Sequence, residues 1–288
     1  MKLKKVKDLF QKELKDMYDK EEIDSFFYML LESYLGLKRI QLALNPELSY
    51  PEKELYPIYD GLKKLKQNIP IQYIIGETEF YGLRFKVNKD VLIPRPETEE
   101  LVQWIINQQP NSKSNQFNIL DIGTGSGCIA ISLAKNLQNA RVYALDVSEK
   151  ALKVAKMNAK FNLVDVTFIE ANILDPQTWI TELKKMKFDI IVSNPPYVRE
   201  QEKEQMKANV LNNEPHLALF VENNNPLLFY NAISQFAVNN LSQNGSLYFE
   251  INEYLGKQMK QLLNAFNFRM IELKQDIFGK DRMIKGIK

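Results

Sequence analysis

The sequence has little cysteine and little histidine. Among its 288 residues, Cys128 is the only cysteine and His216 the only histidine. One cysteine cannot form an intrachain disulfide or supply a cysteine zinc cluster, so we expect a reducing compartment and no bound metal. One histidine leaves none for a catalytic pair, and we expect His216 to be structural or to line the rim of a site.

Long apolar runs are missing as well. The first residues, Met1 to Lys7, lack the apolar run of a signal peptide. No stretch approaches the roughly 18 continuous apolar residues of a membrane-spanning helix. We therefore expect a cytoplasmic protein without a membrane partner.

Neither sign of charge is in large excess. The chain has 38 basic and 36 acidic residues and a net charge of +2, so its overall charge does not indicate a nucleic-acid partner. We expect no direct nucleic-acid substrate, a monomeric protein, and a solvated face where basic residues gather between Lys257 and Lys288. Hydrophobic residues make up 45% of the chain, which is ordinary for a folded protein, and the length favours two domains.

The apolar pattern changes twice along the chain. In residues 1–69 apolar residues recur at steps of three and four, which predicts a helical domain that docks a substrate or only packs. Residues 70–95 are rich in aromatic and β-branched residues with glycine turn signals, which predicts a β-hairpin connector. Residues 96–288 alternate between helical and strand patterns, which predicts βαβ units around a mostly parallel sheet.

The alternating part can be divided into elements. We predict strands at residues 118–122, 141–145, 166–169, 188–193 and 246–251. We predict helices at residues 96–107, from 126, from 148, from 175 and at 226–240. Open sheets of this kind bind ligands at the carboxyl ends of their strands, so the loops that follow the strands are the candidate site.

A glycine-rich turn follows the first of these strands. It consists of Gly123, Thr124, Gly125, Ser126 and Gly127. Glycine lets a ligand approach the backbone there, but a dinucleotide site would also need glycine where Cys128 stands. Asp146 follows about 20 residues later, where a carboxylate can accept hydrogen bonds from both ribose hydroxyls. The turn and the acid together predict S-adenosylmethionine, whose sulfonium and amino acid tail replace the phosphates.

Three more residues are candidates for cofactor contacts. After the third strand, Asn172 could hydrogen-bond the adenine edge and Ile173 could cover the adenine face. An ordinary loop would explain these two residues equally well. Thr98 lies in the first turn of the helix opened by Pro96 and could help to hold the cofactor's carboxylate, although helix capping is an equal alternative.

The strand at residues 188–193 runs into Asn194, Pro195, Pro196 and Tyr197, where the prolines prevent the strand from continuing. An amide nitrogen is a poor nucleophile because its lone pair is delocalised, so both of its N–H groups must be held. The Asn194 side-chain oxygen and the Pro195 carbonyl can accept those hydrogens, and the Tyr197 ring can pack against a flat amide or base. We predict these four residues to be catalytic, with orientation replacing a strong base. Glu250, near the end of a later strand, is either a capping carboxylate or part of this site.

Six segments carry a resemblance to a known family. They are residues 70–76, 80–82, 93–99, 121–127 and 194–197, together with Glu214-Pro215. Through them the chain is similar, over essentially its whole length, to the PrmC/HemK family of peptide chain release factor N(5)-glutamine methyltransferases. The segment at residues 93–99 is more specific than Asn-Pro-Pro-Tyr, which also occurs in amino-directed DNA and RNA methyltransferases.

The resemblance implies a Rossmann-like, seven-stranded S-adenosylmethionine-dependent methyltransferase domain with a small N-terminal helical domain. It implies methylation of the glutamine in the Gly-Gly-Gln loop of peptide chain release factors. It matches residues 123–127, Asp146 and Asn194 to cofactor contacts, and residues 194–197 to the site of the substrate amide. Asn172 and Asn213 depart from the family pattern, which has an acid and an aromatic residue at these places.

Two other functions remain open on the sequence. An exocyclic adenine amine of DNA or RNA is one alternative acceptor, although the net charge and the lack of a basic, aromatic-rich recognition segment argue against it. The other is a non-catalytic protein that binds the cofactor or docks a partner. Such a binder would have no need of the turn at residues 194–197.

Overall fold

A computed structural model describes residues 1–109, 116–205 and 208–288. The chain divides into two compact units. The first unit contains residues 1–76 and the helix α10 (Ala208–Asn213), and the second contains the rest of the described chain. No helix in the described ranges is both long and apolar enough to cross a bilayer.

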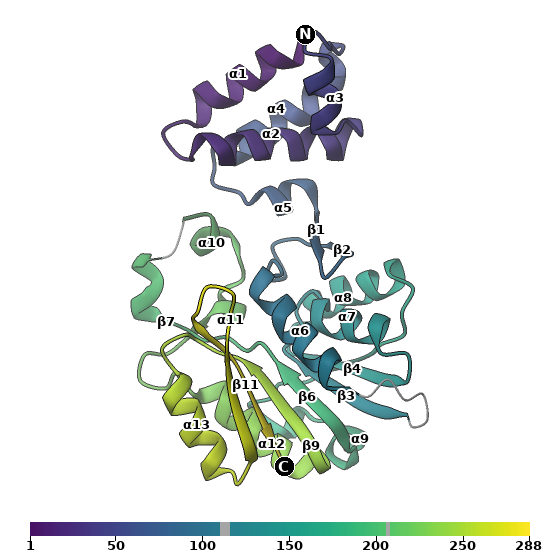
Figure 1. The fold of residues 1–288 in the computed structure, drawn as a ribbon, viewed down its shortest axis with the longest axis vertical. Helices are drawn as coiled ribbons and strands as arrows, with labels where there is room; N and C mark the ends of the chain where they lie inside the picture. Colours follow the sequence, from purple (N-terminus) through teal and green to yellow (C-terminus); the bar gives the residue numbers. More distant parts are fainter. Residues whose placement is uncertain (110–115, 206–207) are drawn as a thin grey trace. The chain divides into compact units, whose positions relative to one another are not determined.

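The first unit is helical (Figure 1). Besides α10, it contains α1 (Leu3–Leu14), α2 (Lys20–Leu35), α3 (Arg39–Leu44), the 3-10 helix η1 (Glu52–Leu55), α4 (Tyr56–Leu65) and α5 (Ile71–Ile75). In α1 the buried residues are Leu3, Val6, Phe10 and Leu14, the spacing that places side chains on one face of a helix. This confirms the helical prediction for the N-terminal part.

The predicted hairpin is present but shorter than expected. Strands β1 (Glu77–Phe80) and β2 (Leu83–Lys86) pair antiparallel. The strand-like reading of the preceding residues was wrong, because Ile71–Ile75 form helix α5. Ile71 and Ile74 are three positions apart, and in a helix this spacing buries both of them in the core. This burial outweighs the preference of their β-branched side chains for strands.

The second unit contains one seven-stranded sheet, in the order β10-β11-β9-β6-β3-β4-β5. Its strands are β3 (Phe117–Ile122), β4 (Ala140–Asp146), β5 (Thr167–Glu170), β6 (Phe188–Ser193), β9 (Leu241–Glu250), β10 (Arg269–Gln275) and β11 (Asp281–Ile287). Strands β3, β4, β5, β6 and β9 run parallel, whereas β11 lies antiparallel between β9 and β10. The C-terminal segment that we expected to be a solvated face thus supplies two strands of the sheet.

Helices connect these strands. They are α6 (Pro96–Gln108), α7 (Cys128–Asn136), α8 (Glu149–Phe161), η2 (Pro176–Thr178), α9 (Thr181–Lys185), η3 (Glu200–Gln205), α11 (His216–Leu219), α12 (Leu228–Asn240) and α13 (Gly256–Ala265). A small parallel pair, β7 (Val198–Arg199) and β8 (Phe220–Val221), lies apart from the main sheet. Predicted boundaries shift by up to five residues. For example, α7 begins at Cys128 because Ser126 and Gly127 belong to the turn, and β9 begins five residues before the expected Ser246.

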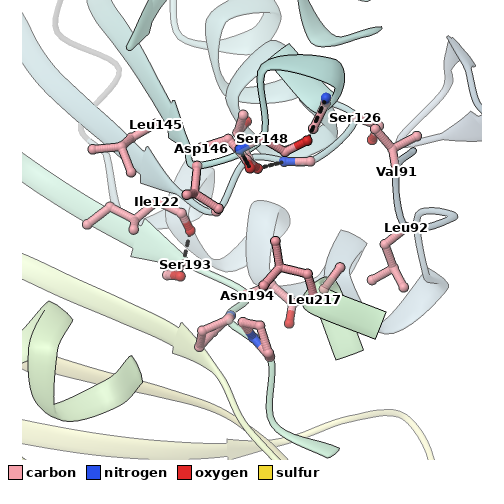
Figure 2. A pocket seen from close by; sticks show the side chains of 18 of the residues that line it. Val91, Leu92, Ile122, Ser126, Leu145, Asp146, Ser148, Ser193, Asn194 and Leu217 are labelled. Carbon is pink, nitrogen blue, oxygen red and sulfur yellow. Dashed lines mark hydrogen bonds between the residues drawn. The ribbon is translucent and has the colours of Figure 1, made fainter. Parts of the chain in front are cut away.

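The carboxyl ends of the central strands are tied together. The hydroxyl of Ser193, the last residue of β6, donates to the carbonyl of Ile122, the last residue of β3, at 2.6 Å (Figure 2). The loops that follow these two strands therefore start from a fixed position.

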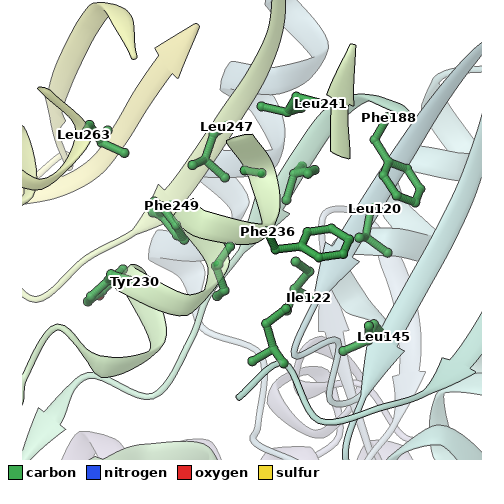
Figure 3. Packing of buried hydrophobic residues seen from close by; sticks show 14 of the residues in the cluster. Leu120, Ile122, Leu145, Phe188, Tyr230, Phe236, Leu241, Leu247, Phe249 and Leu263 are labelled. Atoms are coloured by element: carbon green, nitrogen blue, oxygen red, sulfur yellow. The ribbon is translucent and has the colours of Figure 1, made fainter. Parts of the chain in front are cut away.

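Both faces of the sheet are covered. Consecutive residues of β3 point to opposite sides, with Leu120 in one core cluster and Ile119 in the other. The first cluster contains Phe236 of α12 and Leu263 of α13 (Figure 3). The second contains residues of α6 and α7. A parallel sheet between two helical layers is the architecture that the alternating pattern predicted.

Candidate active site

A pocket of about 260 Å³ lies at the carboxyl edge of the sheet in the second unit (Figure 2). The predicted site residues that line it are Thr98, Gly123, Thr124, Gly125, Ser126, Asp146, Asn172, Ile173, Asn194, Pro195 and Pro196. Residues from loops after β3, β4, β5 and β6 thus converge on one cavity. Gly127 and Tyr197 are outside this lining.

The glycine turn is anchored to the neighbouring strand. The N–H groups of Gly123 and Thr124 both donate to the Leu145 carbonyl of β4, at 2.8 and 3.0 Å. Gly125 has a φ of 55°, and a Cβ built at that position would meet no other atom within 4 Å. The turn is therefore an open cradle in which a ligand can reach the backbone, as the predicted cofactor requires.

Gly127 has a different role. A Cβ there would lie 2.9 Å from Ile131 Cδ1 in α7 and 3.1 Å from Ala155 Cβ in α8. This glycine allows α7 and α8 to pack closely, and the structure places it behind the cavity wall.

Asp146 connects the turn with the pocket. Its carboxylate accepts hydrogen bonds from the N–H of Gly125 at 2.8 Å and the N–H of Ser148 at 2.9 Å. Burial raises the pKa of Asp146, and these backbone bonds act in the opposite direction. A carboxylate has about four lone-pair sites, so two remain for ligand hydroxyls. The remaining acceptor sites fit the ribose hydroxyls of the expected cofactor.

Asp121 supports the glycine turn without lining the pocket, a role that the sequence reasoning did not assign to it. It is buried beneath the glycine turn, where one carboxylate oxygen accepts the Thr124 hydroxyl at 2.6 Å. The other oxygen, Oδ1, has no hydrogen-bond partner among the described residues. Burial raises the pKa of Asp121 to about 7. An acid at the end of a buried strand, directly before the turn, was the signal that could have found it.

Hydrogen bonds link two residues of the tetrapeptide, Asn194 and Tyr197, through Thr98 and Glu250. Asn194 Nδ2 donates to Thr98 Oγ1 at 3.2 Å, and the Thr98 hydroxyl donates to Glu250 Oε2 at 2.6 Å. The Tyr197 hydroxyl donates to the other oxygen, Glu250 Oε1, at 3.0 Å. Tyr197 is thus bonded to Glu250, and the structure does not place its ring along the pocket. Burial raises the pKa of Glu250, whereas the two hydroxyl bonds lower it.

Asn172 shapes its own loop. Its side-chain oxygen accepts the N–H of Leu174 at 2.9 Å, and its main-chain oxygen accepts the indole N–H of Trp179 at 2.8 Å. One lone pair of Oδ1 is engaged, so an adenine contact has the other lone pair as acceptor and the side-chain nitrogen as donor. Ile173 is buried and borders the pocket, as expected for a residue that covers a ring.

An ion pair between a buried glutamate and a partly exposed arginine holds another part of the wall. Arg95 Nη2 lies 2.6 Å from Glu214 Oε1, and Glu214 Oε2 accepts the N–H of Ile93 at 3.2 Å. Pro94, Arg95 and Pro215 all line the cavity. The sequence pointed to both segments but not to the pair that joins them.

Two family models match the chain: "Methyltransferase small domain" over residues 103–276 and "PrmC N-terminal domain" over residues 8–76. A release factor glutamine methyltransferase of Flavobacterium psychrophilum is 56% identical over 99% of each chain. Another, of Bacteroides thetaiotaomicron, is 41% identical over 92% of each. This chain belongs to the release factor glutamine methyltransferase (PrmC) family. The family, the seven-stranded fold and S-adenosylmethionine as cofactor are thereby confirmed.

Solved structures similar to this PrmC-family chain agree on the fold. "T. Thermophilus 16S rRNA N2 G1207 methyltransferase (RsmC) in complex with AdoMet and Guanosine" has a TM-score of 0.53 and 17% identity, covering 74% of this chain and 49% of that one. "Crystal structure of hMettl16 catalytic domain in complex with MAT2A 3'UTR hairpin 6" has a TM-score of 0.54 and 17% identity, covering 72% and 76%. At such identities the likeness shows the fold alone.

Proposed function

We propose that this PrmC-family enzyme transfers a methyl group from S-adenosylmethionine to the side-chain amide nitrogen of the glutamine in the Gly-Gly-Gln loop of peptide chain release factors. The observation that carries the proposal is the match to release factor glutamine methyltransferases along 99% of the chain, including both of its units. A relative matched only in the sheet would have supported methyl transfer but not this substrate.

The residues of the pocket have separable roles. The cofactor supplies an electrophilic methyl group on its sulfonium when it is bound. We propose that the glycine turn and Asp146 hold it. Because Asn194 Nδ2 is bonded to Thr98, Asn194 Oδ1 is left to accept one N–H of the substrate amide, and the Pro195 carbonyl would accept the other. Fixing both hydrogens orients the nitrogen lone pair, so positioning supplies the rate enhancement.

Incubation of the purified enzyme with labelled S-adenosylmethionine and intact release factor tests the proposal. We expect one methyl group on one glutamine, located by mass spectrometry, and none on a release factor in which that glutamine is alanine. DNA and RNA oligonucleotides serve as competing acceptors in the same assay. Methylation of adenine in the oligonucleotides but not of the release factor would favour an amino-directed DNA or RNA methyltransferase and contradict the proposal.

We further propose that the helical unit docks the release factor. Its support is the match of residues 8–76 to the PrmC N-terminal domain, and a set of large apolar side chains that this unit exposes. These are Tyr34, Ile40, Leu44 and Tyr56. Exposed apolar side chains of this size are typical of binding surfaces when they gather.

Two polar substitutions test the docking role. The double variant Ile40→Ser, Leu44→Ser should raise KM for intact release factor and leave KM for a short glutamine-containing peptide unchanged. Met157→Ser removes an apolar side chain that is also more than half exposed, from the second unit, and should change neither KM. An equal KM for intact release factor in the double variant and the wild type would rule out docking through these residues.

We propose a monomer located in the cytoplasm. The proposed substrates act on ribosomes, which places them in the cytoplasm. Light scattering of the purified enzyme should give the mass of a single chain. Fractionation of cells should recover the enzyme in the same fraction as the release factors.

A further inference from the structure

Glu250 and Thr98 lie behind Asn194 and are almost completely buried, with 1% and 2% of their surfaces exposed. Glu250 is the last residue of β9, and Thr98 lies in the first turn of α6. Burying a carboxylate is unfavourable unless it is well hydrogen-bonded. Glu250 meets that condition through two hydroxyl donors, one on each of its oxygens.

The chain of bonds has a direction. A threonine hydroxyl carries one hydrogen, and Thr98 gives this hydrogen to Glu250. Its oxygen must then act as acceptor toward Asn194, which it can do only if the NH₂ end of the Asn194 amide faces it. The oxygen end of Asn194 is consequently turned away from Thr98. If the Asn194 amide were reversed, its NH₂ group would face the substrate. An NH₂ group is a donor and cannot accept the N–H groups of a substrate amide.

We propose that Glu250 is a positioning residue for methyl transfer. By accepting the Thr98 and Tyr197 hydroxyls it sets the direction of the hydrogen bond from Asn194, and so keeps Asn194 Oδ1 available to the substrate amide. The inference rests on the proposed function for the identity of that amide. The hydrogen-bond direction itself is a property of this chain alone.

A purely structural role for Glu250 is separable from this one. The Tyr230 hydroxyl donates to the main-chain oxygen of Glu250 at 3.1 Å, so the backbone at the end of β9 is held independently of the side chain. Arg282, whose positive charge also acts on Glu250, forms its own ion pair with Asp276 at 3.1 Å. The hydrogen bonds of the Glu250 carboxylate therefore serve mainly Thr98 and Tyr197.

The first test is Glu250→Gln, which keeps the shape of the side chain but adds an NH₂ donor. The glutamine can donate to Thr98, which frees the Thr98 hydrogen for Asn194 and allows the Asn194 amide to reverse. We expect kcat to fall on the order of 10- to 100-fold at saturating cofactor, with an unchanged cofactor Kd. Thr98→Val should lower kcat similarly, whereas Thr98→Ser keeps the hydroxyl and should retain most of the activity.

Ser132→Ala is the matched control. Ser132 lies in α7 and is also buried. Its hydroxyl has no hydrogen-bond partner among the described residues, so loss of this hydroxyl should leave kcat unchanged. Near wild-type kcat in Glu250→Gln would overturn the proposal. So would equal losses in Thr98→Ser and Thr98→Val, because the hydroxyl would then be irrelevant.

The second test needs no substrate. In protein labelled with ¹⁵N on asparagine side chains, the Asn194 signal is assigned by its loss in Asn194→Asp. We expect that signal to shift and its hydrogens to exchange faster in Glu250→Gln and Thr98→Val, but not in Ser132→Ala. An unmoved Asn194 signal would overturn the proposal even if kcat fell. A wild-type enzyme that fails to methylate release factor would count against the proposed function only.

Discussion

The side chain of Glu214 bonds at the same time to the guanidinium of Arg95 and to the main chain of Ile93, with distances of 2.6 and 3.2 Å. Arg95 and Ile93 are 119 and 121 positions away in the sequence from their common partner, Glu214. Glu214 is buried, whereas Arg95 is partly exposed. One carboxylate thus fixes both a side chain and a stretch of backbone that border the cofactor pocket.

Glu214→Ala should destabilise the second unit. It leaves the buried Ile93 N–H without an acceptor, which costs about 1–3 kcal/mol in the free energy of unfolding. Chemical denaturation followed by a probe in the second unit measures the change. Glu149→Ala breaks the exposed ion pair of Glu149 with Lys153 in the same unit and should cost much less, because an exposed ion pair contributes little to stability. Equal effects of the two variants would contradict the role given to Glu214.

Asp146→Ala should weaken cofactor binding. It removes the acceptor predicted for the ribose hydroxyls and the acceptor that holds Gly125, at a cost of about 1.5–3 kcal/mol for a bond to a charged acceptor. Calorimetric titration with S-adenosylmethionine measures the affinity. Asp189→Ala is the control, because Asp189 also accepts a backbone N–H, from Asn118 at 2.8 Å, but does not line the pocket. An unchanged affinity in Asp146→Ala would show that the ribose assignment is incorrect.

Asn194→Ala should impair transfer far more than cofactor binding. Loss of the acceptor for one amide hydrogen should lower kcat on the order of 10²–10³-fold, as loss of an oxyanion-hole donor does. Asn194→Asp keeps an acceptor but places charge near the sulfonium and loses the donor to Thr98. That charge favours the cationic ground state over the neutralising transition state, so kcat should stay low while the cofactor Kd holds or falls. Single-turnover rates with saturating cofactor measure both; near wild-type rates in Asn194→Ala would remove Asn194 from the mechanism.

Asp121 should make the stability of the second unit depend on pH. Its pKa rises on folding to about 7, so between its ordinary value and about 7 the folded state binds more protons than the unfolded state. Stability should therefore be greatest at low pH and fall as pH rises toward 7, by at most about 4 kcal/mol from this group. Denaturation midpoints of the cofactor-free enzyme at about pH 5 and about pH 8 measure the effect. Asp121→Asn should flatten the difference, and an undiminished pH dependence in that variant would assign it to another group.

Local sequence patterns predicted much of the site. The turn at residues 123–127, Asp146 and Asn194 each follow a buried strand, and parallel strands bring such positions to one edge. The direct partners of these residues could not be predicted in the same way. Thr98 and Glu250 are 152 positions apart, and no periodicity relates residues at such a distance.

The misread elements have physical causes. Ile71–Ile75 carry strand-forming side chains, but the core of the helical unit takes up two of them at helical spacing. Strand β10 is largely exposed and rich in charged residues, so its sequence lacks the apolar alternation that predicts a strand. Helix α10 belongs to the helical unit although it lies more than 130 residues after the unit's main segment. Long-range packing determines this placement, and local sequence patterns do not report it.

Strand β11 lies inside the sheet between β9 and β10 and pairs antiparallel with both. β10 therefore joins the sheet only through β11. A lesion that removes β11 would detach β10 at the same time and leave β9 with an unpaired edge. Open edges of this kind promote aggregation.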